Sequence, residues 1–151
     1  MHIAQAFPAE PMHGFLTARV SDYMTAAVLT LDPETPLPEV ERQFSLHDFN
    51  GFPVVDRGTL VGMLTKFDVL KSFVFTPRTV VPPYAELSRQ TAQQIMTRNV
   101  ITFQPETPLT RVLQTLVDFR VKSFPIVEGQ QLVGIIARED IVRALHERCT
   151  H

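Results

Sequence analysis

The sequence predicts an α/β fold made of two β-α-β-β-α repeats that pack together with pseudo-two-fold symmetry. The first observation is a duplication: residues 20–73 align without a gap with residues 92–145, and 17 of the 54 pairs are identical. A match at one fixed offset is typical of repeated supersecondary units. The second is that each copy alternates short β-type runs with helical periodicity. The third is a hydrophobic content of 44%, which can supply a shared core.

The elements of the first repeat follow from its local patterns. Residues at 37, 40 and 44 are apolar and form one helical stripe, preceded by a threonine suited to an N-cap and a proline suited to the first helical position. Two β-type runs enclose a turn over residues 56–59. We therefore expect, in order, strand Val28–Leu31, a helix capped by Thr35 and starting at Pro36, strands Phe52–Val55 and Leu60–Leu64, and helix Lys66–Phe73.

The second repeat replays the same order, and the two copies set the domain boundaries. Its expected elements are strand Val100–Phe103, a helix capped by Thr107, strands Phe124–Val127 and Leu132–Ile136, and helix Glu139–Arg148. Residues 15–75 form the first repeat and 91–147 the second. The three prolines of residues 76–90 predict an extended linker. Residues 1–14 are expected to be a flexible tail.

Composition excludes several classes of function. A formal net charge of −2 does not indicate the basic surface that binding to nucleic-acid phosphates requires. No apolar run approaches the roughly 18–20 residues of a membrane span, and the first residues lack the apolar stretch of a secretion signal. Cys149 is the one cysteine, so no intrachain disulfide can form, and a cytoplasmic location is expected. The spacing of His146, Cys149 and His151 does not complete a zinc site, so no metal is expected.

The repeated motifs resemble a known family. Each half contains Met-Thr, then V-x-T-x-x-P-x-x-x-L, F-P-[VI]-V and L-V-G-x-[LI], and ends on an aspartate, Asp68 or Asp140. This combination, over roughly residues 15–147, resembles a tandem pair of cystathionine β-synthase (CBS) domains, the Bateman module. The resemblance implies a regulatory module that binds adenosine-containing ligands such as AMP, ADP, ATP or S-adenosylmethionine in clefts between the halves. No hydrolase, nucleotide-triphosphatase or paired-carboxylate motif is present, so we do not expect an enzyme.

The chemistry of the candidate site centres on these aspartates. A carboxylate can accept hydrogen bonds from both hydroxyls of a ribose 2′,3′-diol, which suits Asp68 and Asp140. The hydroxyl of Thr65 and the amide of Lys66, at a helix start, could hold a phosphate. A structural alternative is that Thr65 and Asp68 form a helix capping pair.

The second repeat departs from this pattern. Ala137 replaces the phosphate-side hydroxyl, and Arg138 and Glu139 precede Asp140. Arg138 could supply a phosphate contact, whereas the charge of Glu139 opposes one. We therefore rank the Asp68 cleft above the Asp140 cleft.

The remaining site residues are implied by the resemblance, in which the aspartate of one half works with the first strand of the other. The backbone of Asn99, Val100 and Ile101 would then lie near an adenine held by Asp68, and Ala27–Leu29 near one held by Asp140. Met63 and Ile135 would flank the base, and the phosphate-facing positions before each Phe-Pro strand are Asn50-Gly51 and Lys122-Ser123. Because only Lys122 of these is charged, AMP or ADP is favoured over a triphosphate.

The sequence gives less information on partners than on the fold and the site. The resemblance implies a homodimer, for which Val69-Leu70 and Ile141-Val142 with Leu145 could supply exposed apolar helix faces, and a regulated enzyme or transporter that the sequence does not identify. The alternative function is a ligand-free interaction module that uses the repeat pair for docking and dimerisation. Ala137 and the scarcity of phosphate-facing arginine favour that alternative.

Overall fold

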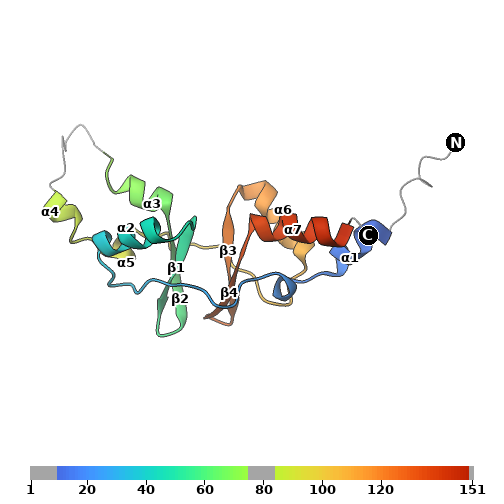
Figure 1. Cartoon of the computed structure of the whole chain (residues 1–151). Helices are drawn as coiled ribbons and strands as arrows, with labels where there is room; N and C mark the ends of the chain where they lie inside the picture. Colours follow the sequence, from blue (N-terminus) through green and yellow to red (C-terminus); the bar gives the residue numbers. More distant parts are fainter. Residues whose placement is uncertain (1–9, 75–83, 150–151) are drawn as a thin grey trace. The chain divides into compact units, whose positions relative to one another are not determined.

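The structure is a computed structural model that describes residues 10–74 and 84–149. It is a mixed α/β chain that divides into two compact units (Figure 1). Of the described residues, unit 1 comprises 10–27, 102–128 and 133–149, and unit 2 comprises 28–74, 84–101 and 129–132. Each unit therefore combines segments of both sequence repeats. Unit 2, for example, holds most of the first repeat together with residues 92–101 of the second.

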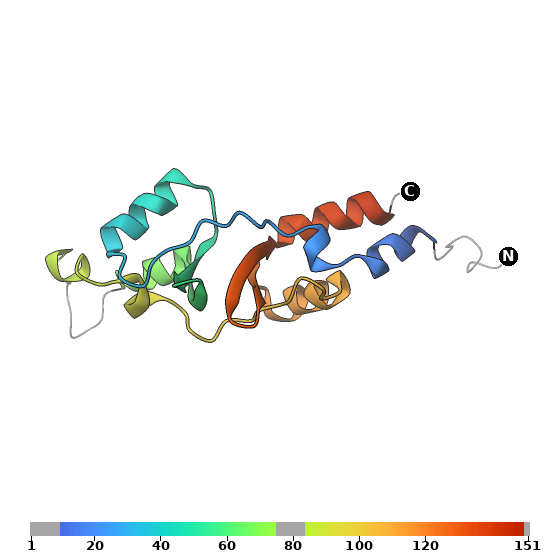
Figure 2. The ribbon, with the colours of Figure 1, turned by 90° about the horizontal axis from the view of Figure 1, so that it is seen from below.

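Each unit contains one β-hairpin, or most of one, with helices around it. Unit 1 has α1 (Glu10–Thr17), the 3-10 helix η2 (Val20–Asp22), α6 (Leu109–Phe119), β3 (Ser123–Glu128), most of β4 (Gln131–Ala137) and α7 (Arg138–Cys149). Unit 2 has α2 (Leu37–Leu46), β1 (Gly51–Asp56), β2 (Thr59–Thr65), α3 (Lys66–Lys71), α4 (Tyr84–Leu87) and α5 (Ala92–Ile95). In unit 1, α1 lies beside α7 (Figure 2). No helix of the described ranges is long and apolar enough to cross a membrane.

The β1–β2 hairpin forms as the sequence predicts. The strands are antiparallel, with Phe52 opposite Leu64 and Asp56 opposite Thr59. Arg57 and Gly58 form the turn with φ of 52° and 85°. Two consecutive positive φ values match the twist of the strands and give the tight hairpin connection. The turn 129–132, which counts with unit 2, pairs with this hairpin through Gln131 and Thr59.

The sequence predicts a strand at the start of each repeat, and both predictions are wrong. In the described chain, Leu31 makes one isolated parallel bridge with Val54, and Phe103 makes one with Ile126. Prolines explain why the pairing stops there. Each bridge is flanked by a proline on both segments, and proline has no N–H to donate to the next ladder position. These prolines are Pro33 and Pro53 in unit 2, and Pro105 and Pro125 in unit 1.

Helix boundaries also differ from the predictions at several points. Pro36 and Pro108 are the N-caps of α2 and α6, because the carbonyl of Pro36 already accepts from the Val40 amide; the predicted caps Thr35 and Thr107 lie one residue too early. Residues 10–14 belong to α1 instead of a loose tail, and residues 1–9 lie outside the described residues. The linker prediction fails over 84–87, which is helical, while 75–83 are not described.

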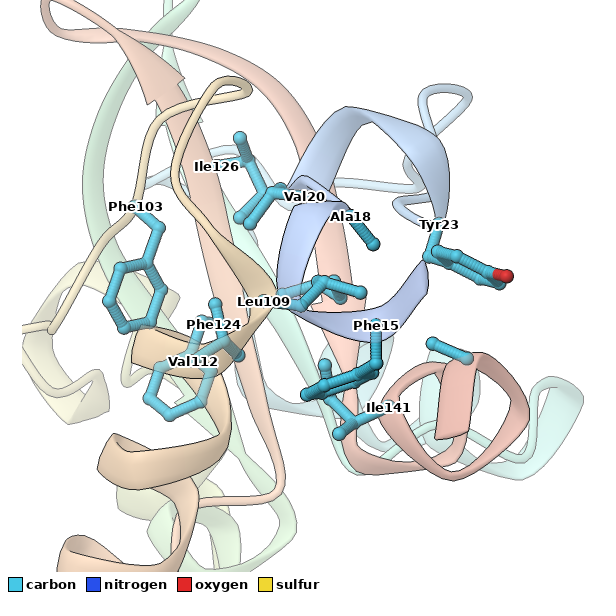
Figure 3. Close-up of a cluster of buried hydrophobic side chains, with 12 residues drawn as sticks. Phe15, Ala18, Val20, Tyr23, Phe103, Leu109, Val112, Phe124, Ile126 and Ile141 are labelled. Atoms are coloured by element: carbon cyan, nitrogen blue, oxygen red, sulfur yellow. The ribbon is translucent and has the colours of Figure 1, made fainter. Parts of the chain in front are cut away.

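Each unit has its own hydrophobic core. In unit 1, Phe15 from α1 and Ile141 from α7 meet Leu109 and Val112 from α6, and the ring of Phe103 packs edge-on against Phe124 (Figure 3). In unit 2, the apolar stripe of α2 packs on the β1–β2 hairpin, with members Leu31, Leu37, Val40, Phe52, Val54, Leu64, Leu87, Ala92 and Met96. Leu87 and Met96 tie α4 and the segment after α5 to this core. The predicted apolar stripe of α2 is therefore its buried face.

A repeated Met-Thr segment crosses one strand in each unit. In unit 2, the amide of Met63 donates to the Thr97 carbonyl at 2.9 Å, and the Thr97 amide donates back at 2.8 Å. In unit 1, Thr25 and Ile135 exchange the same two bonds, both at 2.9 Å. The segment comes from the other repeat in both cases, since Thr97 belongs to the second repeat and Met63 to the first. The repeats thus exchange matching segments.

The glycine of each L-V-G motif permits this crossing. A Cβ added to Gly62 would lie 2.8 Å from the Thr97 carbonyl oxygen, and one added to Gly134 would lie 3.0 Å from that of Thr25. Both neighbours are backbone atoms held by the paired hydrogen bonds, so neither can move away cheaply.

We predict that Gly62→Ala and Gly134→Ala each lower the free energy of unfolding by about 1–3 kcal/mol, the usual cost of overpacking. Urea denaturation measures this change. Gly129→Asn is the matched control, because Asn tolerates the positive φ of 63° and a Cβ there meets no atom within 4 Å. A loss for the control equal to that of Gly62→Ala would contradict the steric explanation.

Candidate functional site

The Asp68 carboxylate is held by the start of α3. Its Oδ2 accepts from the Thr65 amide at 2.9 Å and from the Thr65 hydroxyl at 3.0 Å. The Asp68 amide donates to the Thr65 hydroxyl oxygen at 3.2 Å. This is a reciprocal capping box, which satisfies two helix-end donors at once. The capping interpretation of the pair Thr65 and Asp68 is therefore correct for this structure.

The second oxygen of Asp68 is also occupied. Oδ1 accepts from the Thr97 hydroxyl at 3.1 Å and lies 3.3 Å from Nζ of Lys71. A carboxylate offers about four acceptor positions, and four donors surround this one. Asp68 is 2% exposed, which makes it a buried charge with a full set of partners. Thr97 comes from the second repeat, so a side chain of each repeat meets at this carboxylate.

The Asp140 carboxylate, in unit 1, is less completely engaged. Its Oδ2 accepts from the Ala137 amide at 2.8 Å, and its Oδ1 lies 3.3 Å from a terminal nitrogen of Arg143. Ala137 has no hydroxyl to donate. The Asp140 side chain is 14% exposed. The two aspartates therefore occupy equivalent places in the repeats but differ in how many donors they hold.

Arg143 connects Asp140 to the segment before Met24. A terminal nitrogen of Arg143 donates to the Tyr23 carbonyl at 3.4 Å, and its guanidinium lies over the Tyr23 ring, 5.4 Å from the centroid. The Tyr23 hydroxyl points away from the core cluster (Figure 3) and donates to Glu147 at 2.8 Å. Its oxygen accepts from Nε of Arg148 at 3.2 Å, a contact that raises the pKa of the Arg148 guanidinium above its usual value. This network fixes the crossing segment against α7.

The other predicted residues of the Asp68 site all belong to unit 2. Met63 lies in β2 and forms the bridge to Thr97. Asn99, Val100 and Ile101 begin two residues after Thr97; Asn99 and Ile101 are exposed and Val100 is half-buried.

One backbone amide of unit 2 that was expected to bind a phosphate already donates a hydrogen bond within the protein. The Lys66 amide donates to the Asn50 carbonyl at 3.2 Å, so the expectation that this amide is available for a phosphate is wrong for this structure. The Lys66 ammonium is half-exposed, 3.8 Å from Asp48. The Lys66 side chain and the Thr65 hydroxyl remain as donors that could turn to a ligand.

The predicted residues of the Asp140 site lie in unit 1 with two exceptions, Val28 and Leu29. Ile135 bridges Thr25, and the Arg138 amide donates to the Lys122 carbonyl at 3.0 Å. The side chains of Arg138 and Lys122 are exposed, and Ser123 begins β3. Ala27 belongs to unit 1, as Asp140 does. Leu29 belongs to unit 2 and is exposed.

The sequence reasoning missed three residues that touch the aspartates. Thr97 carries the hydroxyl bonded to Asp68, and its signal was the Met-Thr pair repeated at 24–25 and 96–97. Lys71 and Arg143 form the ion pairs, and their signal was a basic residue three positions after each aspartate on a helix.

The described residues contain no group of three His, Cys, Asp or Glu side chains that could hold a metal ion. His151, which was weighed as part of a tail cluster, lies outside the described residues.

Comparison with known proteins places these features in a family. The CBS domain model matches residues 20–74 and 92–147. The chain is 29% identical over 136 residues to the L-aspartate semialdehyde sulfurtransferase of Methanocaldococcus jannaschii, covering 89% of this chain but 24% of that protein. It is also 29% identical to the CBS domain-containing protein YhcV of Bacillus subtilis over 122 residues, 81% of each protein. The chain thus spans about a quarter of the first relative and most of the second.

Solved structures show the same fold. The CBS domain pair of protein MJ0100, in complex with 5′-methylthioadenosine and S-adenosyl-L-methionine, matches with a TM-score of 0.70 and 27% identity over 87% of this chain and 98% of that one. CBSX2 in complex with AMP matches with a TM-score of 0.74 and 22% identity over 85% and 96%. The α/β class and the tandem-repeat prediction are confirmed, and the chain belongs to the CBS domain family as a CBS pair.

Proposed function

We propose that the protein is a non-catalytic regulatory module that binds an adenosine-containing ligand, with AMP or ADP favoured, at its CBS repeats. One observation carries this proposal: in unit 2 the Asp68 carboxylate of the first repeat meets the Thr97 hydroxyl of the second at 3.1 Å. The Asp68 carboxylate is a group that can accept hydrogen bonds from both hydroxyls of a ribose. Through this contact it lies beside Thr97, two residues before the segment 99–101 that we expect to face the adenine. A ligand there would contact residues of both repeats and would report on their arrangement.

The scarcity of fixed phosphate donors supports a ligand with few phosphates. The amides of Lys66 and Arg138 are both committed to backbone carbonyls. The side chains of Lys66, Lys122 and Arg138 are exposed, and holding them around a triphosphate would cost side-chain entropy. A monophosphate or diphosphate needs fewer of these contacts. AMP in complex with CBSX2, and S-adenosyl-L-methionine in complex with MJ0100, are ligands of this size in related folds.

We predict that AMP binds with heat detectable by titration calorimetry, and that 2′,3′-dideoxy-AMP binds at least about tenfold more weakly, because the loss of two hydroxyl donors to a carboxylate removes more than 1.4 kcal/mol. The double variant Asp68→Asn with Asp140→Asn should lose the preference for the diol. Asp56→Asn, which alters an exposed carboxylate at the end of β1, is the control and should retain it.

Equal binding of AMP and its dideoxy analogue would refute sugar recognition by a carboxylate. Absence of binding by AMP, ADP, ATP and S-adenosylmethionine would refute the ligand-sensor function as a whole.

A second candidate function, a ligand-free docking scaffold, is favoured by a different feature. Unit 1 has an apolar groove of about 460 Å³ between α6 and α7, here called the α6–α7 groove. It is lined by Leu113, Leu116, Val117, Arg120, Val121, Arg138, Ile141, Val142 and Leu145. Thermal-shift screening separates the two functions, since a ligand that binds the folded state stabilises it by RT ln(1 + [L]/Kd) and a pure scaffold gains nothing.

We also propose that the α6–α7 groove forms a homodimer contact. Val117 and Val142 are 67% and 64% exposed, which is unusual for apolar side chains that line one groove. The expectation that Ile141 is part of an exposed face is wrong, because Ile141 is 2% exposed and belongs to the core. Of the pair Val69-Leu70 on α3, Leu70 is 65% exposed as expected, whereas Val69 is half-buried and packs against the core of unit 2.

We predict that Val142→Glu converts the dimer to a monomer, because a charge in an apolar contact loses its hydration without gaining a partner. Light scattering coupled to size-exclusion chromatography gives the mass. Val74→Glu is the matched control, since Val74 is 62% exposed and lies outside the groove. A monomeric wild-type protein, or a Val142→Glu variant that stays dimeric, would contradict this contact.

A further inference from the structure

The two aspartates differ in the number of acceptor positions left for a sugar. Around Asp68 the described residues place four donors: the Thr65 amide, the Thr65 hydroxyl, the Thr97 hydroxyl and the Lys71 ammonium. A carboxylate has about four acceptor positions. A ribose 2′,3′-diol, which donates two hydrogen bonds, can reach Asp68 only by displacing some of these donors.

Asp140 is different because one side of its carboxylate is less crowded. In the part of unit 1 that the structure describes, its contacts are the Ala137 amide and the Arg143 guanidinium. Two of the four positions therefore remain for a diol. The difference traces to one substitution between the repeats, Ala137 in place of Thr65, and to the Thr97 hydroxyl, which reaches Asp68 while the equivalent Thr25 has no bond of this kind to Asp140 among the described contacts.

We propose that Thr97 and Lys71 act as intramolecular competitors for the Asp68 carboxylate, so that a ribose-containing ligand fills the Asp140 site before the Asp68 site. This inference rests on the proposed function and deepens it by assigning an order to the sites. It reverses the ranking expected from the sequence, which favoured Asp68 because of the Thr65 hydroxyl.

The competition persists even when the ligand carries a phosphate. If Thr65 turns its hydroxyl from Oδ2 to a phosphate, it frees one acceptor position on Asp68, but a diol donates two hydrogens. The second position must come from Oδ1, where Thr97 and Lys71 are bound at 3.1 and 3.3 Å. Thr97 is an exposed residue and Lys71 is half-exposed, so both can move away without repacking the core.

In this proposal Thr97 determines which aspartate binds the ligand first, and it can be substituted without changing the charge of the site. Valine has nearly the same shape as threonine but cannot donate to Asp68, and its substitution changes no charge. Lys71 is less suitable, because removing its charge also alters the attraction of any anionic ligand.

Titration calorimetry with AMP tests the proposal in single-site backgrounds. Asp140→Asn leaves the Asp68 site, and Asp68→Asn leaves the Asp140 site; asparagine keeps one oxygen to accept from the amide at the helix start. We expect Asp68→Asn to retain the higher affinity of the wild-type protein and Asp140→Asn to lose it. In the Asp140→Asn background, Thr97→Val should tighten AMP binding by about fivefold, the effect of removing one competing hydrogen bond of ordinary strength.

Thr97→Ser in the same background is the rescue control and should restore the affinity of Asp140→Asn alone. A merely structural role for Thr97 predicts weaker binding in Thr97→Val, not stronger. The proposal is overturned if Asp68→Asn is the variant that loses the tighter site, or if Thr97→Val leaves AMP affinity unchanged or lowers it. If the wild-type protein binds AMP and only these results fail, the sensor function stands without the order of sites; if the wild-type protein binds none of the four adenosine-containing ligands, both fall.

Discussion

The structure depends on a pair of backbone hydrogen bonds that each Met-Thr segment makes with a strand of the other repeat. Met63 exchanges both bonds with Thr97, and Ile135 exchanges both with Thr25. The segment can approach because the neighbouring strand residue is Gly62 or Gly134, where any Cβ would press on a carbonyl. Each compact unit is thus completed by the other repeat. Cutting the chain between the repeats would leave each half without the segment that closes over its hairpin.

The same crossing positions the candidate site. In unit 2 it brings the Thr97 hydroxyl to the buried Asp68, so that a negative charge with little exposure is compensated by four donors. A buried carboxylate without such partners would be costly. In unit 1 the crossing segment is fixed differently, by Tyr23 held between Arg143, Arg148 and Glu147. Equivalent positions of the two repeats therefore hold carboxylates with different numbers of hydrogen-bond donors.

Much of the fold was predictable because hydrophobic period and turn chemistry are local. The hairpin at Arg57-Gly58 and the buried stripe at Leu37 and Val40 follow from the sequence alone. The strand at Val28–Leu31 failed because pairing depends on the partner, and Pro53 on that partner has no N–H. At the site, the capping pair of Thr65 and Asp68 was one of two interpretations that the sequence left open. The Thr97 contact was not predicted, because which hydroxyl reaches a given carboxylate depends on a crossing between residues 29 positions apart along the chain. The Lys71 contact is local, three residues after Asp68 on α3, and its spacing was a signal that the sequence analysis did not use.

The most direct test of ribose binding by the repeated aspartates is a crystal structure of the full chain grown with a limiting amount of AMP. The account predicts AMP in unit 1, with both ribose hydroxyls on the Asp140 carboxylate and Asp68 still bonded to Thr97. AMP bound only at Asp68, AMP bound away from both aspartates, or AMP with its ribose turned away from them would contradict it.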